Sequence, residues 1–142
     1  MVHLDADGKV LARRELDLEG RANSGLEGVC VDSSGGVHAV SEKDPRLFLT
    51  LAADLSVRSR QELDFAKDLS GLDCNGGQGR LWVLSDQSRR LYLWGPEEGV
   101  VRTYPLPFDK AEGVAVDRAA GLAYIVSESE DRLYVFAIDD PE

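Results

Sequence analysis

Leu26-Glu27-Gly28-Val29-Cys30-Val31-Asp32 recurs in related form, so that the segment is found three times along the chain, and this repetition indicates the fold. It returns as Leu69-Ser70-Gly71-Leu72-Asp73-Cys74-Asn75 and again as Ala111-Glu112-Gly113-Val114-Ala115-Val116-Asp117. The aligned glycines lie 43 and then 42 residues apart. A fixed period of this length indicates a repeat architecture, in which each repeat is one supersecondary unit.

Three further blocks follow the first one in the same order. The second block reads Val37-His38-Ala39-Val40-Ser41-Glu42, Leu81-Trp82-Val83-Leu84-Ser85-Asp86 and Ala123-Tyr124-Ile125-Val126-Ser127-Glu128. The third reads Arg46-Leu47-Phe48-Leu49, Arg90-Leu91-Tyr92-Leu93 and Arg132-Leu133-Tyr134-Val135, and a fourth, at 57–63 and 100–106, follows in two repeats. Each block is short, rich in β-branched, aliphatic and aromatic residues and bounded by turn residues, which is typical of β-strands. Four short strands per repeat form the blade of a β-propeller.

The N-terminal segment also fits the repeat, since residues 2–17 align with residues 49–64 at a constant offset of 47. The chain therefore begins inside a third strand, continues with a fourth, and ends on a repeat that has only three strands. We predict an all-β fold of four-stranded antiparallel blades, three blades per chain. The predicted parts are displaced outer strands at 1–24, blades at 25–67 and 68–110, and a three-stranded partial blade at 111–142.

Three blades are too few to close a propeller ring, so both ends of the array would expose apolar surface. Two copies around a two-fold axis would give six blades, with each N-terminal strand completing the last blade of its partner. We therefore predict a homodimer. The alternative is that the sequence is an excised piece of a longer propeller.

Charge and composition narrow the classes of partner. The net charge is −10, from 26 acidic against 16 basic residues, which disfavours nucleic acid. No apolar run approaches the ~20 residues that span a bilayer. The N-terminus has no basic-then-apolar pattern, so we expect a cytoplasmic protein, or a periplasmic or envelope-associated one if a targeting segment was removed. Cys30 and Cys74 have no zinc-site spacing. The two could form one disulfide, but free buried thiols are the expected state without an export signal.

The repeated motifs also carry a family resemblance. Gly25-Leu26-Glu27-Gly28-Val29, Val40-Ser41-Glu42, Leu69-Ser70-Gly71-Leu72, Leu84-Ser85-Asp86 and Ala111-Glu112-Gly113-Val114-Ala115-Val116-Asp117 together resemble the SdiA-regulated (YjiK-like) family of bacterial proteins, over roughly residues 2–140. The resemblance implies a β-propeller, with some members held at the bacterial envelope. More distantly, the Glu-Gly strand openings look like those of gluconolactonase and esterase-like phytase propellers, whose central carboxylates bind calcium or another divalent metal. Family members usually carry a whole propeller in one chain, and this chain has about half of one.

Two sets of aligned polar residues are the candidate sites. Glu27, Ser70 and Glu112 open the innermost strands and are the candidate metal ligands. A second set, together with the aromatic side chain expected to be partly exposed, forms a candidate ligand funnel: Glu42, Asp86, Glu128 and Trp94. Carboxylates gathered in this way repel one another unless protonation, basic partners or a cation relieves them. Calcium takes oxygen ligands of this kind.

A structural interpretation of the same carboxylates is open. Each could accept backbone N–H groups at a blade corner, or pair with one of the arginines that follow the second set, Arg46, Arg89, Arg90 and Arg132.

No arrangement of residues indicates nucleophilic catalysis. Ser41, Ser85 and Ser127 recur in every blade, which is typical of corner residues, and no triad accompanies them. We therefore predict a non-catalytic propeller module that binds a small ligand or calcium at an acidic central funnel. The alternatives are a metal-dependent hydrolase of lactonase, esterase or phytase type, and a purely structural half-propeller building block.

Overall fold

The computed structural model describes residues 1–16, 18 and 25–139, and within them all regular structure is β-strand. Thirteen strands form four antiparallel sheets, in each of which consecutive strands are neighbours. The first blade holds β3 (Leu26–Val31), β4 (Val37–Ser41), β5 (Leu47–Leu51) and β6 (Val57–Glu62). The second holds β7 (Gly71–Asp73), β8 (Leu81–Ser85), β9 (Arg90–Gly95) and β10 (Gly99–Pro105). The predicted all-β fold of antiparallel blades is thus confirmed.

The remaining strands form two incomplete sheets. β11 (Ala111–Asp117), β12 (Leu122–Ser127) and β13 (Arg132–Ala137) make a three-stranded sheet, and β1 (Val2–Leu4) and β2 (Val10–Arg13) make a hairpin. Parts of the predicted end segments, residues 17, 19–24 and 140–142, lie outside the described residues.

The hairpin β1–β2 repeats the structure of β5–β6. Val2 is paired with Arg13 as Leu49 is paired with Arg60, and both pairs of strands have a register shift at the equivalent point, after His3 and after Thr50. The hairpin therefore has the structure of the outer half of a blade.

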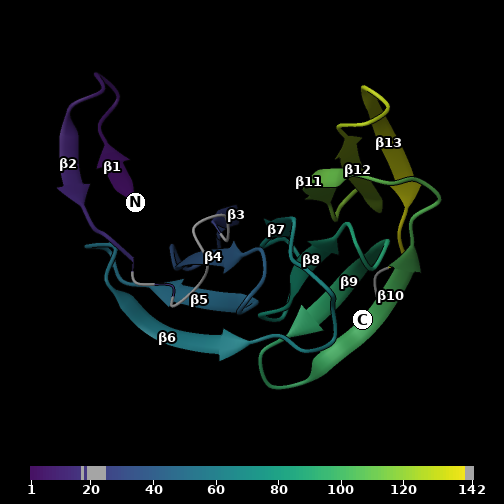
Figure 1. Ribbon diagram of the computed structural model, residues 1–142, viewed down its shortest axis with the longest axis horizontal. Coiled ribbons are helices and arrows are strands. Elements are labelled where there is room, and N and C mark those ends of the chain that lie inside the picture. The colour runs from purple at the N-terminus through teal and green to yellow at the C-terminus, as the bar shows by residue number, and fades with distance from the viewer. Residues whose placement is uncertain (17, 19–24, 140–142) are drawn as a thin grey trace.

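The blades lie side by side in an open arc (Figure 1), with β3, β7 and β11 in contact along its inside and β6 and β10 on its outside. Apolar side chains fill the spaces between blades. Val40, Phe48, Leu72 and Val83 belong to the core between the first two blades, while Leu84, Leu93, Phe108 and Ile125 belong to the core between the second and third. Neighbouring blades thus bury each other's apolar faces, which is how propellers are stabilised.

Turn residues set where the first strand of a blade reverses into the second. Between β3 and β4 the carboxylate of Asp32 accepts hydrogen bonds from the backbone N–H groups of Ser34 and Gly36, both at 2.8 Å. Gly35 has a φ of 85°, a left-handed conformation that glycine adopts without strain. The other Oδ of Asp32 lies 2.9 Å from Nε2 of His38, whose ring stacks on Phe48. A polar turn is thereby tied to the apolar blade beneath it.

Trp94 does not belong to a ligand site, and the expectation that it would be partly exposed is wrong. Its side chain is 2% exposed and meets Phe48 edge to face, with ring centroids 5.0 Å apart. β9, on which it lies, is covered on both edges by β8 and β10, and the ring points into the core between the first two blades.

The cysteines form a disulfide rather than the free thiols expected from the sequence. Cys30 and Cys74 have Cα atoms 5.5 Å apart, although 44 residues separate them in the chain. Cys30 lies on β3 and Cys74 directly follows β7, and these two strands are neighbours on the inside of the arc.

The two ends of the arc leave apolar faces exposed. On the three-stranded sheet, Val126, Leu133 and Val135 are 47%, 59% and 54% exposed, and on β3 both Val29 and Val31 are 62% exposed. Within the described residues there is no helix long and apolar enough to cross a membrane. The exposed faces are the flanks at which a further blade would pack.

Candidate functional site

One polar pocket gathers most of the predicted site residues at the end of the inner strands where β3 and β11 begin. Its volume is about 200 Å³. Five of the seven predicted residues line it: Glu27, Glu42, Ser70, Asp86 and Glu112. Glu128 lines an adjoining pocket together with Glu112, and Trp94 lies in the core. The aligned positions of successive blades thus meet at one place.

Ser70 lies at the centre of this pocket without a hydrogen-bond partner for its hydroxyl. The residue is 4% exposed, and its Oγ is the one buried side-chain nitrogen or oxygen without such a partner among residues 1–16, 18 and 25–139. Its backbone N–H donates to the carbonyl of Leu84, which holds the residue at the start of β7. A buried polar atom that stays unpaired costs about 1–3 kcal/mol. This hydroxyl is therefore available to a ligand oxygen or a cation in the pocket.

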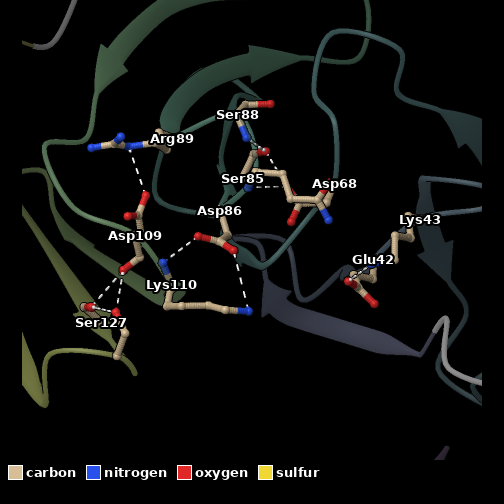
Figure 2. A network of polar contacts seen from close by, with 12 residues as sticks. Glu42, Lys43, Asp68, Ser85, Asp86, Ser88, Arg89, Asp109, Lys110 and Ser127 are labelled. Carbon is tan, nitrogen blue, oxygen red and sulfur yellow. Dashed lines mark hydrogen bonds and ion pairs between the residues drawn. The ribbon is translucent and has the colours of Figure 1, made fainter.

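Asp86 joins the second blade to the third (Figure 2). Its Oδ1 accepts a hydrogen bond of 2.6 Å from the backbone N–H of Lys110, and its Oδ2 lies 3.9 Å from Nζ of the same lysine. The side chain of Asp86 is largely buried. This contact matches the structural interpretation in which a carboxylate accepts a backbone N–H at a blade corner.

Glu42 lies on the other side of the pocket, next to Lys43 (Figure 2). Oε1 of Glu42 and Nζ of Lys43 are 2.7 Å apart, and this contact raises the pKa of the lysine. The backbone carbonyl of Glu42 accepts the N–H of Leu69, directly before Ser70. The two walls of the pocket are thus fixed by bonds between blades, and each wall carries one lysine.

Asp68 is a pocket residue that sequence reasoning missed. It is 3% exposed, and its Oδ1 accepts hydrogen bonds from Oγ of Ser85 at 2.5 Å and from the backbone N–H of Gln87 at 3.0 Å. The repeat alignment places Gly25 and Lys110 at the equivalent positions of the other blades, so no shared residue type marked this position. A buried Asp held by two donors fixes the corner on which Asp86 and Gln87 stand.

Glu112 shows how dense the negative charge is. Partial burial raises its pKa, and the carboxylates of Asp86, Glu128 and Glu27 raise it further, while Lys110 acts against them. The pocket has five carboxylates, including Asp68, against two ammonium groups. An excess of negative charge in a partly desolvated pocket favours a cationic ligand.

The predicted arginine partners do not neutralise the second set of carboxylates. Their ion pairs are with other acidic residues: Arg46 with Glu62 at 3.8 Å, Arg89 with Asp109 at 3.2 Å and Arg132 with Glu130 at 3.1 Å. Arg90 donates to a backbone carbonyl. The arginine interpretation is wrong, because none of these four side chains lines the pocket, whose basic groups are the two lysines.

The repeated serines are corner residues, as expected. Ser41 donates to the carbonyl of Pro45, Ser85 to Asp68 and Ser127 to the carbonyl of Asp109, and all three are at most 3% exposed. None is accessible as a nucleophile in this arrangement.

The pocket offers oxygen donors but no preformed metal cage. No three His, Cys, Asp or Glu side chains in the described part of the chain lie close enough together to hold a metal ion. Calcium takes six to eight oxygen ligands, which a single copy of this pocket does not bring together. The donor type fits a hard cation, and the number of donors calls for more oxygens than one chain supplies.

Comparison with known families identifies the chain. The model of the SdiA-regulated family matches residues 1–137, and the chain belongs to this family.

Similar solved structures agree on the fold. A protein of unknown function from Bacteroides caccae superposes with a TM-score of 0.62 at 14% identity, over 98% of this chain and 54% of its own. Kluyveromyces lactis Hsv2 gives 0.57 at 11% identity, over 84% and 34%. A catalytically inactive H270A virginiamycin B lyase from Staphylococcus aureus gives 0.51 at 14% identity, over 90% and 46%. The chain thus spans between a third and just over half of these propeller-like structures, and such identities show the fold alone.

Proposed function

We propose that this SdiA-regulated protein is a non-catalytic propeller module that binds a divalent cation, calcium first, in the acidic pocket around Ser70. The observation that carries the proposal is the unpaired, buried Oγ of Ser70 among five carboxylates. A bound cation would accept a lone pair of this Oγ, and it would offset the charge repulsion that, in addition to partial burial, raises the pKa of Glu112.

The ligands we assign are the predicted first set, Glu27, Ser70 and Glu112. All three line the pocket and open the inner strands of successive blades. Glu42 and Asp86 are already engaged by Lys43 and Lys110, so they would set the field around the cation rather than bind it directly. Oxygen-only ligation favours calcium over zinc, which prefers nitrogen and sulfur.

A second copy of the chain is the partner we propose for completing the pocket. Each end of the arc has an exposed apolar flank and an incomplete sheet, the hairpin β1–β2 at one end and the three-stranded sheet at the other. In a pair of copies, each of these ends would gain a neighbour. Because each copy contributes its own inner-strand carboxylates, the ring would add the oxygens that one chain lacks.

Calorimetric titration of the metal-free protein with calcium tests the proposed site. We expect saturable binding that Ser70→Ala weakens by about tenfold, equivalent to about 1.4 kcal/mol. Glu27→Gln should weaken it at least as much, because it removes a charged ligand. Glu97→Gln, on an exposed turn away from the pocket, is the matched control and should bind as the wild type does. Absence of calcium binding at millimolar concentration, or equal affinity in Ser70→Ala, would contradict the proposal.

A further inference from the structure

We infer that β2 of one chain pairs with β13 of a second copy in a defined register, and that this places the partner's Glu112 beside Glu27. The inference rests on the proposed binding site and names the surface through which a second copy completes it. Its basis is the repeat geometry at the two ends of the arc.

The end that carries the hairpin has room for the inner part of a blade. An apolar pocket of about 520 Å³ lies between β1 and the first blade, lined among others by Val2, Leu26, Val29 and Val37. On the opposite face of the same sheet, β7 packs against β3 and β4 as the inner strand of the second blade. Because β1–β2 is the outer half of a blade, the pocket is part of the space that the inner strands of that blade would fill.

The other end of the arc supplies those strands. β11, β12 and β13 are the inner three strands of a blade, and no strand in the described residues pairs with the outer edge of β13. The outward face of this sheet is apolar at Val126, Leu133 and Val135. An apolar face with an open edge thus matches an apolar pocket beside a spare outer strand.

The repeat fixes the register of the pairing. Within the first blade, Leu47 pairs with Glu62 and Leu49 with Arg60. Leu49 pairs with Ala39 on the second strand of its blade, and at the same position of the other blades Val83 pairs with Tyr92 and Ile125 with Tyr134. Tyr134 is therefore the counterpart of Leu49, so β2 should oppose the partner's Tyr134 with Arg13 and the partner's Val135 with Ala12.

The short strand β1 would leave its place in this exchange. It has three residues, all exposed, and in the described part of the chain it pairs only with β2. β13 has six residues and would offer β2 a longer edge. Exchanging a three-residue partner for a six-residue one favours the two-chain pairing over the hairpin, provided that the concentration is high enough.

The acidic pocket then crosses the interface. Within one chain Ser70 follows Glu27 by one blade and Glu112 follows Ser70 by another, and all three line one pocket. In the ring, the partner's Glu112 stands one blade before Glu27. A closed ring would therefore surround its axis with four glutamates and two serines from this position.

A pair of engineered cysteines tests the register. Val135 is exposed and Ala12 is only partly buried, so Ala12→Cys with Val135→Cys should leave folding intact. We expect mild oxidation to give a covalent dimer on a non-reducing gel. The control, Ala12→Cys with Leu133→Cys, places the second thiol two residues away on the same face, about 7–8 Å from the first, where a disulfide cannot form without backbone movement.

Equal cross-linking in both variants, or a wild-type mass of 15.5 kDa by light scattering at high concentration, would overturn the pairing. Calcium titration of the cross-linked dimer separates this inference from the proposed function. We expect about tenfold tighter binding than in a monomer trapped by dilution. Equal affinity in the two forms would overturn the shared pocket while leaving the Ser70 site in place, and a cross-linked dimer that binds no calcium would remove the site itself.

Discussion

At the junction of the first two blades, Cys30 of β3 is bonded to Cys74 after β7, whereas at the next junction Asp73 of β7 accepts a hydrogen bond of 3.2 Å from the backbone N–H of Val116 on β11. These contacts occupy the same register. In each contact, the residue two positions after the aligned glycine of one inner strand meets the residue three positions after the aligned glycine of the next inner strand. Asn75 strengthens the second junction, since its side-chain amide donates to the carbonyl of Val116 at 2.8 Å.

The repeat therefore fixes which positions of neighbouring inner strands meet, but not the chemistry that joins them. A covalent bond at the first junction constrains the unfolded chain as well as the folded one. The polar contacts at the second junction act only in the folded state and must offset the desolvation of their own groups. The two junctions should therefore respond very differently to mutation and to reductant.

Removing the disulfide should have the largest effect. Closing a loop of this length lowers the entropy of the unfolded chain by an amount worth about 4 kcal/mol, so Cys30→Ser with Cys74→Ser should destabilise the protein by about that much. Urea unfolding followed by circular dichroism measures the change. Wild-type protein in reductant is the control and should match the double variant. A loss in the free energy of unfolding below about 1 kcal/mol would show that the packing between the first two blades holds them together without the disulfide.

Removing the polar contacts of the second junction should have an intermediate effect. Asp73→Ala leaves the N–H of Val116 without its partner in a partly buried position, and we expect a loss of about 1–3 kcal/mol that reductant does not change. Asp117→Ala is the matched control, because that carboxylate caps an exposed turn through Ala120 and should cost less than the junction residue. Equal losses in the two variants would mean that the junction contact has no special role.

The smallest effect on stability is expected from Glu112, which lies at the pocket end of the inner strand β11. Burial raises the pKa of its carboxyl above the ordinary value of 4.5, so its ionisation disfavours the folded state. Stability attributable to this group is greatest below the unfolded pKa and falls as the pH rises through the folded one. In chelator, Glu112→Gln should be more stable than the wild type at pH 7 by about 0.5 kcal/mol or less, because the side chain is only partly buried and water screens its charge.

Thermal unfolding of both proteins between about pH 3.5 and pH 7 measures this difference in stability. We expect the difference to shrink toward the acid end of the range, where the carboxyl of Glu112 is protonated in the wild type. A variant less stable than the wild type at pH 7 without calcium would show that Glu112 makes a stabilising contact instead. Adding calcium should reverse the order if Glu112 is a ligand.

The repeats made the fold predictable, because strand identity, turn positions and the offset of the N-terminal segment all follow from one period. Contacts between blades were not predictable in the same way. Cys30 and Cys74 occupy different positions of their repeats, and only the one-residue stagger between neighbouring inner strands brings them together. Trp94 was misjudged since its place in the core depends on which face of β9 meets the first blade.

The candidate pocket was predictable to the extent that it uses aligned positions. Glu27, Ser70 and Glu112 could be grouped because each opens an inner strand. Asp68 and the two lysines could not, since each occurs in a single blade and an alignment of repeats finds only what blades share. Because these residues differ between blades, a repetitive scaffold carries a pocket whose sides are not equivalent.

The complementary ends of the arc also have a consequence for assembly. An open edge at β13 and a spare outer strand at β2 are a head-to-tail contact, and such contacts continue into filaments unless the rotation between copies closes them. Closure after two copies depends on the angle between blades, which the packing of Val126, Leu133 and Val135 on the next blade would set. A substitution that changes this angle slightly would convert a closed ring into a polymer without weakening any single contact.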